Sequence, residues 1–226
     1  MPSSKIEKAK NKRKSPTKSK SLINTSSSWK NSHVRPEDTQ VATDFYTQRE
    51  SERYASSNAM HKMQTELTLR AVQLAQLPIG SHVLDAGCGS GFSTEVLQQI
   101  GYKTSAFDLS PHFVSLAKQR NFECKQGDLR NFPFTEKFDG IFSISALQWI
   151  TANPKTAPAE AAKAALEFNT HLRPGGKAVI QFYPKTEEEL LQTAQAFKQN
   201  GFHVNIVTDN PKNPRKRKIY LLLEKK

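Results

Sequence analysis

The chain has 226 residues, a formal net charge of +12 and only two cysteines, Cys88 and Cys124. This length suits one domain with a full core and short appendages, and the cysteine count argues for a reducing compartment and against a disulfide scaffold or a structural zinc site. No apolar stretch of about eighteen residues occurs and no apolar block follows the basic N-terminus, so we expect neither a membrane span nor a secretory signal.

Most of the excess positive charge lies in residues 1–36. This segment holds ten Lys or Arg residues against one acid, Glu7, and so carries +9 of the net charge. Because it is rich in Ser and Lys and has almost nothing apolar to bury, we predict a disordered basic tail. Contact with nucleic-acid phosphates, a nuclear-type basic address in residues 10–14 and a solubilising tail are the open interpretations.

Residues 37–80 form a predicted helical lead-in. Residues 44–60 place three aromatic side chains among charges, which indicates partly helical structure. Over residues 61–77 apolar side chains recur at intervals of three and four, which predicts a helix with one buried stripe that ends before Pro78. We expect this helix to lie across the mouth of the domain or to pack on the sheet.

The remaining residues, 81–226, alternate between predicted strands and helices. Apolar runs predict strands, Ser110 with Pro111 is typical of a helix start, and Pro174 to Gly176 read as a turn. The pattern predicts an α/β fold with a doubly wound, mostly parallel seven-stranded sheet and an antiparallel last strand. The expected strands are 82–84, 103–107, 122–125, 138–144, 177–182, 203–208 and 218–223, and the expected helices are 91–99, 111–120, 158–171 and 186–200.

The first predicted strand ends in a motif that indicates the ligand. Asp85 is followed by glycines at every second position, Gly87, Gly89 and Gly91, which let the backbone pass close to a bound molecule. A dinucleotide fingerprint would have its third glycine where Phe92 stands, and the Asp85 carboxylate would repel a pyrophosphate. The pattern resembles motif I of the class I S-adenosylmethionine (SAM)-dependent methyltransferases, whose cofactor is cationic. A nucleotide site and a glycine turn without a ligand are the alternatives.

Two further acids follow the next predicted strands. Asp108 is placed to accept hydrogen bonds from both hydroxyls of a ribose, and Asp128 to accept one from an adenine amino group, although a helix cap is the alternative for Asp128. Residues 143–149, after the fourth strand, are expected to face the transferred methyl group. The expected cofactor-binding residues are Asp85, Ala86, Gly87, Cys88, Gly89, Gly91, Asp108, Leu109, Asp128, Leu129 and Ser145.

The segment after the fourth strand also bears on the acceptor. Enzymes that methylate the amino group of adenine or cytosine place Asn/Asp-Pro-Pro-aromatic there, whereas residues 145–149 read Ser-Ala-Leu-Gln-Trp. Cys124 lacks the neighbouring proline of a C5-type nucleophile, and no His pairs with carboxylates to make a base or a metal site. We therefore expect a nucleophile that needs no deprotonation, such as a ring nitrogen, with no catalytic acid or base and no metal.

Three side chains are expected to line the acceptor side of the site. Trp149 is placed to stack on a base and Gln148 to hydrogen-bond the edge of that base, with Tyr54 on the same wall. Core filling under the following helix is the alternative for Trp149.

Further runs narrow the resemblance. Over about residues 37–224 the chain resembles the small-subunit (18S-type) rRNA guanine-N7 methyltransferase family of ribosome biogenesis, in the runs 44–46, 52–54, 84–91, 138–140, 143–149, 181–184 and 201–221. The resemblance implies SAM as methyl donor, guanine N7 of small-subunit rRNA as acceptor, and action in the nucleus, nucleolus and cytoplasm of a eukaryote, or in the cytoplasm otherwise. A small-molecule methyltransferase with an incidental basic arm and a non-catalytic ribosome-assembly factor are the alternatives.

The resemblance also implies a protein partner. Members of the family pair with a small zinc-binding activator protein along an edge strand. In the expected topology the strand that runs from Phe122 to Lys125 lies at an exposed edge of the sheet. We therefore predict that the activator docks there to form a heterodimer.

Overall fold

A computed structural model describes residues 34–226 of the chain. Residues 1–33 of the predicted tail therefore lie outside the described part of the chain. The strands are β1 (His82–Ala86), β2 (Lys103–Asp108), β3 (Cys124–Gln126), β4 (Phe138–Ile144), β5 (Leu172–Phe182), β6 (Phe202–Asp209) and β7 (Lys218–Lys225). The helices are η1 (Pro36–Asp38), α1 (Ala42–Phe45), α2 (Gln48–Ala55), α3 (Asn58–Ala75), α4 (Phe92–Ile100), α5 (Pro111–Gln119), α6 (Gln148–Thr151), α7 (Ala157–His171) and α8 (Glu187–Gln199).

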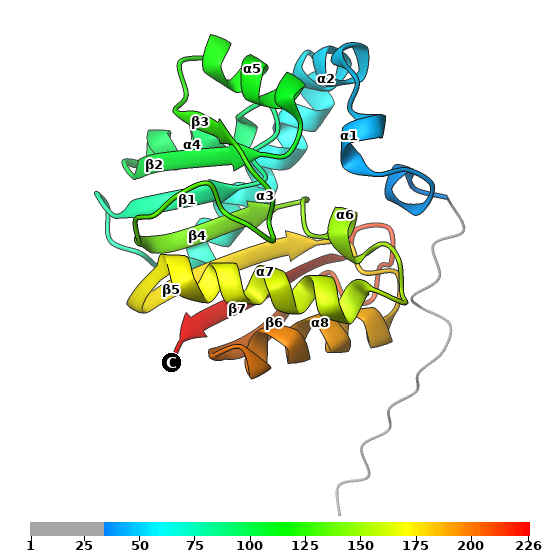
Figure 1. Cartoon of the computed structure of the whole chain (residues 1–226), viewed down its shortest axis with the longest axis vertical. Helices are drawn as coiled ribbons and strands as arrows, with labels where there is room; N and C mark the ends of the chain where they lie inside the picture. The colour runs from blue at the N-terminus through cyan, green and yellow to red at the C-terminus, as the bar shows by residue number, and fades with distance from the viewer. Residues whose placement is uncertain (1–33) are drawn as a thin grey trace, which may run out of the picture.

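The strands form one seven-stranded sheet in the order β3-β2-β1-β4-β5-β7-β6 (Figure 1). The first five strands along the chain pair in parallel, and β7 lies antiparallel between β5 and β6. The predicted fold class, a mostly parallel doubly wound sheet with an antiparallel last strand, is confirmed. The predicted hairpin of the two last strands is present as well.

Several predicted elements differ from the structure. The strand predicted over residues 122–125 is found as β3, Cys124–Gln126, because Phe122 and Glu123 precede the residues that pair with β2. The strand β5 starts at Leu172, so the predicted turn at Pro174 to Gly176 belongs to the strand, where its pairing with β4 shifts register between Phe138 and Gly140. Pro and Gly fit such an irregular strand start because Pro lacks the N–H that regular pairing needs. The short helix α6 was not predicted, because a helix of four residues shows no periodicity in sequence.

Local sequence explains where the helices begin. The helix α5 starts as predicted, with Pro111 in its first turn and the Ser110 hydroxyl accepting a hydrogen bond from the Phe113 nitrogen at 3.4 Å. The helix α3 starts at Asn58, three residues before the predicted helix, because the Ser57 hydroxyl caps it; it ends at Ala75.

Helices cover both faces of the sheet. Along β1, Leu84 points into a core with α7 and α8, whereas Val83 points into a second core with α3 and α4. Ile141 and Phe142 of β4 alternate in the same way. This alternation of buried side chains is what strands covered on both sides require. The packing of α3 on the sheet agrees with one of the two positions expected for it.

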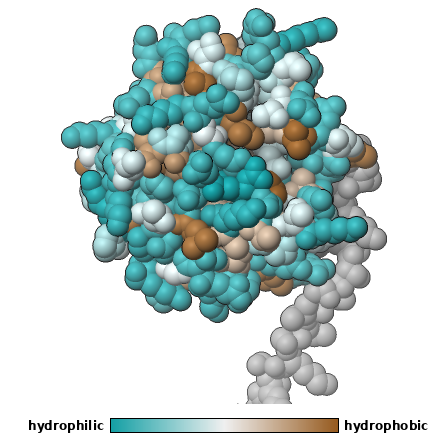
Figure 2. Space-filling model, viewed as in Figure 1, coloured by the Kyte–Doolittle hydropathy of each residue, from teal (hydrophilic) through white to brown (hydrophobic). Residues whose placement is uncertain are grey.

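The carboxyl ends of the parallel strands meet at one edge of the sheet. In Figure 1 the helices α1 and α2 stand at that edge, and α6 follows directly from β4 there. The face shown in Figure 2 is mostly hydrophilic, with apolar side chains in small separate patches. Among residues 34–226 no helix is both long and apolar enough to cross a membrane.

Candidate functional site

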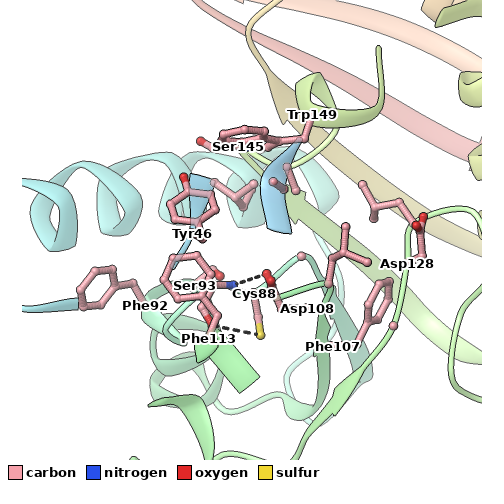
Figure 3. A pocket seen from close by; sticks show the side chains of 18 of the residues that line it. Tyr46, Cys88, Phe92, Ser93, Phe107, Asp108, Phe113, Asp128, Ser145 and Trp149 are labelled. Atoms are coloured by element: carbon pink, nitrogen blue, oxygen red, sulfur yellow. Dashed lines mark hydrogen bonds between the residues drawn. The ribbon is translucent and has the colours of Figure 1, made fainter. Parts of the chain in front are cut away.

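A pocket lies at the carboxyl edge of the sheet, between the turn after β1 and the lead-in helices (Figure 3). Its empty space, which includes space open to solvent, is about 740 Å³. It is lined by Ala42, Tyr46, Tyr54, Gln64, Gly87, Cys88, Gly89, Phe92, Ser93, Phe107, Asp108, Leu109, Phe113, Gly127, Asp128, Leu129, Ile144, Ser145, Ala146, Trp149 and Ile150.

The glycine turn forms the floor of the pocket. Gly87 and Gly89 have φ values of +83° and +56°, a region that side chains disfavour. A Cβ on Gly87 would lie 2.5 Å from the Ala146 Cβ, so the turn after β1 touches the segment after β4 directly. A Cβ on Gly89 would meet nothing within 4 Å. The backbone is therefore open to the pocket at Gly89 and closely packed at Gly87.

Asp108 is the carboxylate that the pocket exposes. One of its oxygens accepts a hydrogen bond from the Gly89 nitrogen at 2.8 Å, and the other accepts one from the Ser110 nitrogen at 2.9 Å. Desolvation raises the pKa of Asp108 to about 6, against the lowering effect of these hydrogen bonds. Each oxygen retains acceptor capacity. The side chain thus offers two fixed acceptors to the pocket, the pattern that a pair of ribose hydroxyls requires.

Asp85 lies beneath the turn and does not line the pocket. Its Oδ2 accepts hydrogen bonds from the Ser93 hydroxyl at 2.6 Å and the Thr94 hydroxyl at 2.7 Å. Its Oδ1 has no partner among the described residues. Burial raises its pKa to about 6. The carboxylate therefore fastens the end of β1 to the first turn of α4, and a direct contact with the cofactor remains a prediction.

Asp128 lines the pocket, and its carboxylate accepts hydrogen bonds from Arg130. Its Oδ1 accepts from the backbone and the Nε of Arg130, both at 2.8 Å, and its Oδ2 accepts from Nη2 at 2.5 Å. Arg130 also pairs with Glu160 at 2.6 Å. Although burial acts to raise it, the pKa of Asp128 is lowered by Arg130. The carboxylate stays ionised, and Oδ2 keeps acceptor capacity for an amino group.

Aromatic rings form the wall opposite the glycine turn. The Trp149 ring lies 5.2 Å from the Tyr46 ring and 5.6 Å from the Phe45 ring, centroid to centroid. Tyr46 also contacts Phe113 at 4.6 Å, and Tyr54 contacts Phe113 at 5.4 Å. Side chains from the lead-in helices thus meet those of α5 and α6 over the pocket.

Ser145 sits where β4 gives way to this wall. Its φ of +58° is unusual for a residue other than glycine. Its hydroxyl donates to the Gln181 side chain at 2.8 Å and accepts from the Gln64 amide at 3.3 Å. Gln148 is buried and donates to the Ser145 carbonyl at 2.7 Å. Ser145 therefore lines the pocket in a strained, hydrogen-bonded conformation, whereas Gln148 is not among the residues that line it.

Most of the predicted site residues come together at this pocket. Those that line it are Gly87, Cys88, Gly89, Asp108, Leu109, Asp128, Leu129, Ser145, Trp149 and Tyr54. Those that do not are Asp85, Ala86, Gly91 and Gln148. The residues that sequence reasoning missed include Tyr46, Phe113 and Gln64, which come from helices outside the strand ends. For Tyr46 the available signal was its place in an aromatic run among charges.

The two cysteines meet beside the pocket. Cys88 of the glycine turn and Cys124 of β3 are both buried free thiols with sulfur atoms 3.5 Å apart. The hydrogen bond with Cys124, together with burial, raises the pKa of Cys88 well above its usual value, so it stays a neutral thiol. Across the described part of the chain, no group of three or more His, Cys, Asp or Glu side chains is arranged to hold a metal ion.

Comparisons with known proteins agree with this geometry. Residues 84–180 match the family model described as a methyltransferase domain. The chain is 34% identical over 200 residues to an 18S rRNA (guanine-N(7))-methyltransferase of Schizosaccharomyces pombe, covering 84% of this chain and 74% of the relative. It is 36% identical over 202 residues to the mouse protein of the same description, covering 84% of this chain and 70% of the relative.

Solved structures show the same fold at lower identity. SAM-bound CalS10, an amino pentose methyltransferase of Micromonospora echinaspora, matches with a TM-score of 0.59 and 16% identity, over 80% of this chain and 98% of that one. A putative methyltransferase solved in complex with the Haloferax volcanii Trm112 activator matches with a TM-score of 0.58 and 18% identity, over 79% of this chain and 96% of that one.

Proposed function

Since this chain belongs to the 18S rRNA (guanine-N(7))-methyltransferase family, we propose that it transfers a methyl group from SAM to N7 of a guanine in small-subunit rRNA. The observation that carries this proposal is the pairing of two walls in one pocket. One wall is a bare glycine turn with a two-oxygen acceptor at Asp108, and the other is an aromatic surface around Trp149. The first suits a ribose-bearing cationic cofactor and the second a purine.

The residues around the turn fit SAM. We assign the ribose hydroxyls to Asp108, the adenine amino group to the free acceptor capacity of Asp128, and the methionine portion to the open backbone at Gly89. When bound, SAM supplies a methyl carbon made electrophilic by its sulfonium. The buried carboxylate of Asp85 and the half-buried carboxylate of Asp108 would place negative charge near that cation. The cofactor contacts of Asp85, Ala86, Gly91 and Leu109 are part of the same proposal.

The acceptor side needs alignment and no base. Guanine N7 carries a lone pair, so attack on the methyl carbon removes no proton beforehand, and catalysis depends on holding the two groups in line. Burial raises the pKa of both Tyr46 and Tyr54, so at neutral pH they are uncharged phenols that donate hydrogen bonds. We propose that Trp149 stacks on the guanine beside these tyrosines. For Gln148 to reach the edge of the base, its side chain has to leave the Ser145 carbonyl.

We further propose that a small zinc-binding activator docks on β3, as predicted. This strand pairs only with β2 and so ends the sheet on that side, and its Lys125 and Gln126 side chains are exposed. The strand also adjoins the pocket, because Gly127 follows it and Cys124 touches Cys88. An added strand would therefore support the glycine turn from behind.

Mapping of N7-methylguanosine by chemical cleavage of rRNA tests the methyl-transfer proposal. Cells that lack the protein should lose cleavage at one guanine of the small-subunit rRNA, and an unchanged pattern would contradict the proposal. Replacing Asp108 with Lys distinguishes an enzyme from an assembly factor that acts by its presence, because only an enzyme would lose the mark. We propose a nucleolar and nuclear site of action with a cytoplasmic pool, which imaging of the tagged chain tests.

A further inference from the structure

We propose that the loop between β6 and β7, residues 210–217, binds the phosphate backbone of the RNA whose guanine enters the pocket. We call residues 210–217 the hairpin loop. This inference rests on the proposed function, because it takes RNA as the substrate. It adds the surface by which that RNA is held outside the pocket.

The hairpin loop is strongly basic. It contains four cationic residues, Lys218 follows it directly, and no acid lies between Asp209 and Glu224. Residues 210–216 are exposed. Within the described residues, no ion pair joins the loop cations Lys212, Arg215 and Lys216 to a carboxylate. Lys212, Arg215 and Lys216 therefore present positive charge that no ion pair of the described residues neutralises.

Hydrogen bonds within the loop hold its shape. The Asn213 side chain accepts from the Arg215 nitrogen at 3.2 Å and from the Lys216 nitrogen at 3.3 Å. The Asn210 amide donates to the Lys216 carbonyl at 3.3 Å. Because these hydrogen bonds already hold the backbone of the loop, binding of a partner to its cations costs less conformational entropy than binding to a free chain.

The hairpin loop lies at the same edge of the sheet as the pocket. Ile219 pairs with Phe182 at the carboxyl end of β5, and Lys218 pairs with Asp209, so the loop projects beyond that end. In Figure 1 it is drawn in salmon at the edge where α6 also lies. RNA held by the loop is therefore on the side of the molecule where the pocket opens.

A strip of cations connects the hairpin loop with α6, which carries Trp149. The Tyr183 ring contacts two of them, with the Lys218 ammonium 5.2 Å and the Arg35 guanidinium 5.8 Å from its centroid. The Lys185 ammonium follows and donates to the Ala152 carbonyl, just past α6, at 3.0 Å. Arg35 also pairs with Glu37 at 3.9 Å and Lys185 with Asp38 at 2.5 Å, so the net positive charge that would attract a polyanion lies in the hairpin loop and Lys218. A polyanion held there would have the aromatic wall beside it for one of its bases.

Charge reversal in the full-length chain tests this inference. The loop variant carries Lys212→Glu, Arg215→Glu and Lys216→Glu. The matched control reverses three exposed lysines at the amino edge of the sheet, Lys103→Glu, Lys137→Glu and Lys198→Glu, and so has the same net charge. Binding of a labelled small-subunit rRNA transcript is measured by anisotropy between about 50 and 200 mM salt.

We expect the loop variant to bind the RNA about tenfold or more weakly at about 100 mM salt, and the slope of log K against log salt to flatten by about 2, since each lost phosphate contact removes about 0.7–0.9. The control should change both quantities far less. Equal losses of RNA affinity in the loop variant and the control would overturn the inference. So would a loop variant that keeps its RNA affinity but loses binding to an acidic protein, because the loop would then be a protein-binding surface. Calorimetry with S-adenosylhomocysteine verifies that both variants keep a folded cofactor site.

The proposed function fails separately from this inference. If the wild-type chain binds the transcript through the loop but leaves the N7-methylguanosine pattern of rRNA unchanged, the acceptor assignment is wrong and the RNA-binding surface stands. If the wild-type chain produces the mark and the loop variant matches the control, the loop inference is wrong and the acceptor assignment stands.

Discussion

The carboxylate of Asp108 accepts a hydrogen bond from the backbone nitrogen of Gly89 at 2.8 Å, so the acceptor of the pocket and its open backbone are held as one unit. Replacing Asp108 with Asn should weaken binding of S-adenosylhomocysteine by about 10- to 100-fold, because hydrogen bonds to a charged group contribute about 1.5–3 kcal/mol. Isothermal calorimetry measures this. Asp139→Asn, which also removes a carboxylate that binds a backbone nitrogen, is the control. Affinity within about twofold of wild type would contradict the assignment of Asp108.

Cofactor binding should weaken as the pH falls. The pKa of Asp108 is raised to about 6, so below that pH its carboxyl group holds a proton and loses acceptor strength. We expect affinity at pH 5 to be about tenfold lower than at pH 7, since about one molecule in ten is then ionised. Calorimetry across this range should show the dependence in the wild type and a flatter profile in Asp108→Asn. The same slope in both would assign the effect to another group, such as Asp85.

Alanine substitutions in the glycine turn should show how much of the loss in stability comes from steric contact and how much from backbone strain. Gly87→Ala places a Cβ 2.5 Å from the Ala146 Cβ, so it should destabilise the fold by more than the about 1–2 kcal/mol that a left-handed residue costs. Gly89→Ala has open space around it and should cost only that strain. Urea denaturation compares the two variants. Partial recovery in Gly87→Ala with Ala146→Gly would show that contact with Ala146 is the cause, and equal losses at both glycines would contradict it.

Trp149→Ala should reduce methyl transfer to the acceptor without reducing cofactor binding. Its ring packs against Phe45 and Tyr46, so its loss removes the stacking surface, worth about 1–3 kcal/mol per base. We expect methyl transfer to rRNA to fall about 10- to 100-fold while affinity for S-adenosylhomocysteine changes little. Trp149→Phe, which keeps an aromatic face, should retain more activity. A parallel loss of cofactor binding would show that Trp149 fills the core instead.

An obstacle on the outer side of β3 should block the activator. Backbone bonds to β2 are made by Glu123 and Gly127, which flank β3, so alternate residues face β2 and the backbone of Gln126 faces outward. Gln126→Pro removes an outward N–H and should abolish co-purification with a Trm112-type activator. Gln126→Ala keeps that N–H and should not. If both variants bind the activator like wild type, another surface is used, and an unchanged melting temperature verifies that the proline variant is folded.

The order of strands and helices could be predicted because each element carries its own periodicity. The ends of the strands then placed Asp108, Asp128 and the glycine turn together without further information. The position of Asp85 could not be predicted in the same way. An acid at the end of a strand reads alike whether it faces a ligand or, as here, the hydroxyls of Ser93 and Thr94 in the next helix.

The aromatic wall was only partly predictable. Trp149 and Tyr54 were expected at the acceptor side, but Tyr46 and Phe113 reach it through packing between helices that lie far apart in sequence. Neither the spacing nor the composition of either segment indicates that contact. Gln148 likewise donates to the carbonyl of Ser145, a residue with a left-handed backbone, and no sequence pattern indicates that contact.

Arg35, near the start of the described chain, donates to the carbonyl of Tyr183 at 2.6 Å. That contact makes the pocket side of the molecule the attachment point of residues 1–33, which carry nine of the ten cations counted in residues 1–36. Because those charges belong to the same molecule as the proposed RNA-binding surface, an RNA that contacted both would bind with their combined affinity, as in any bivalent contact. Two weak RNA contacts in one molecule can give a higher affinity for a long transcript than either contact alone.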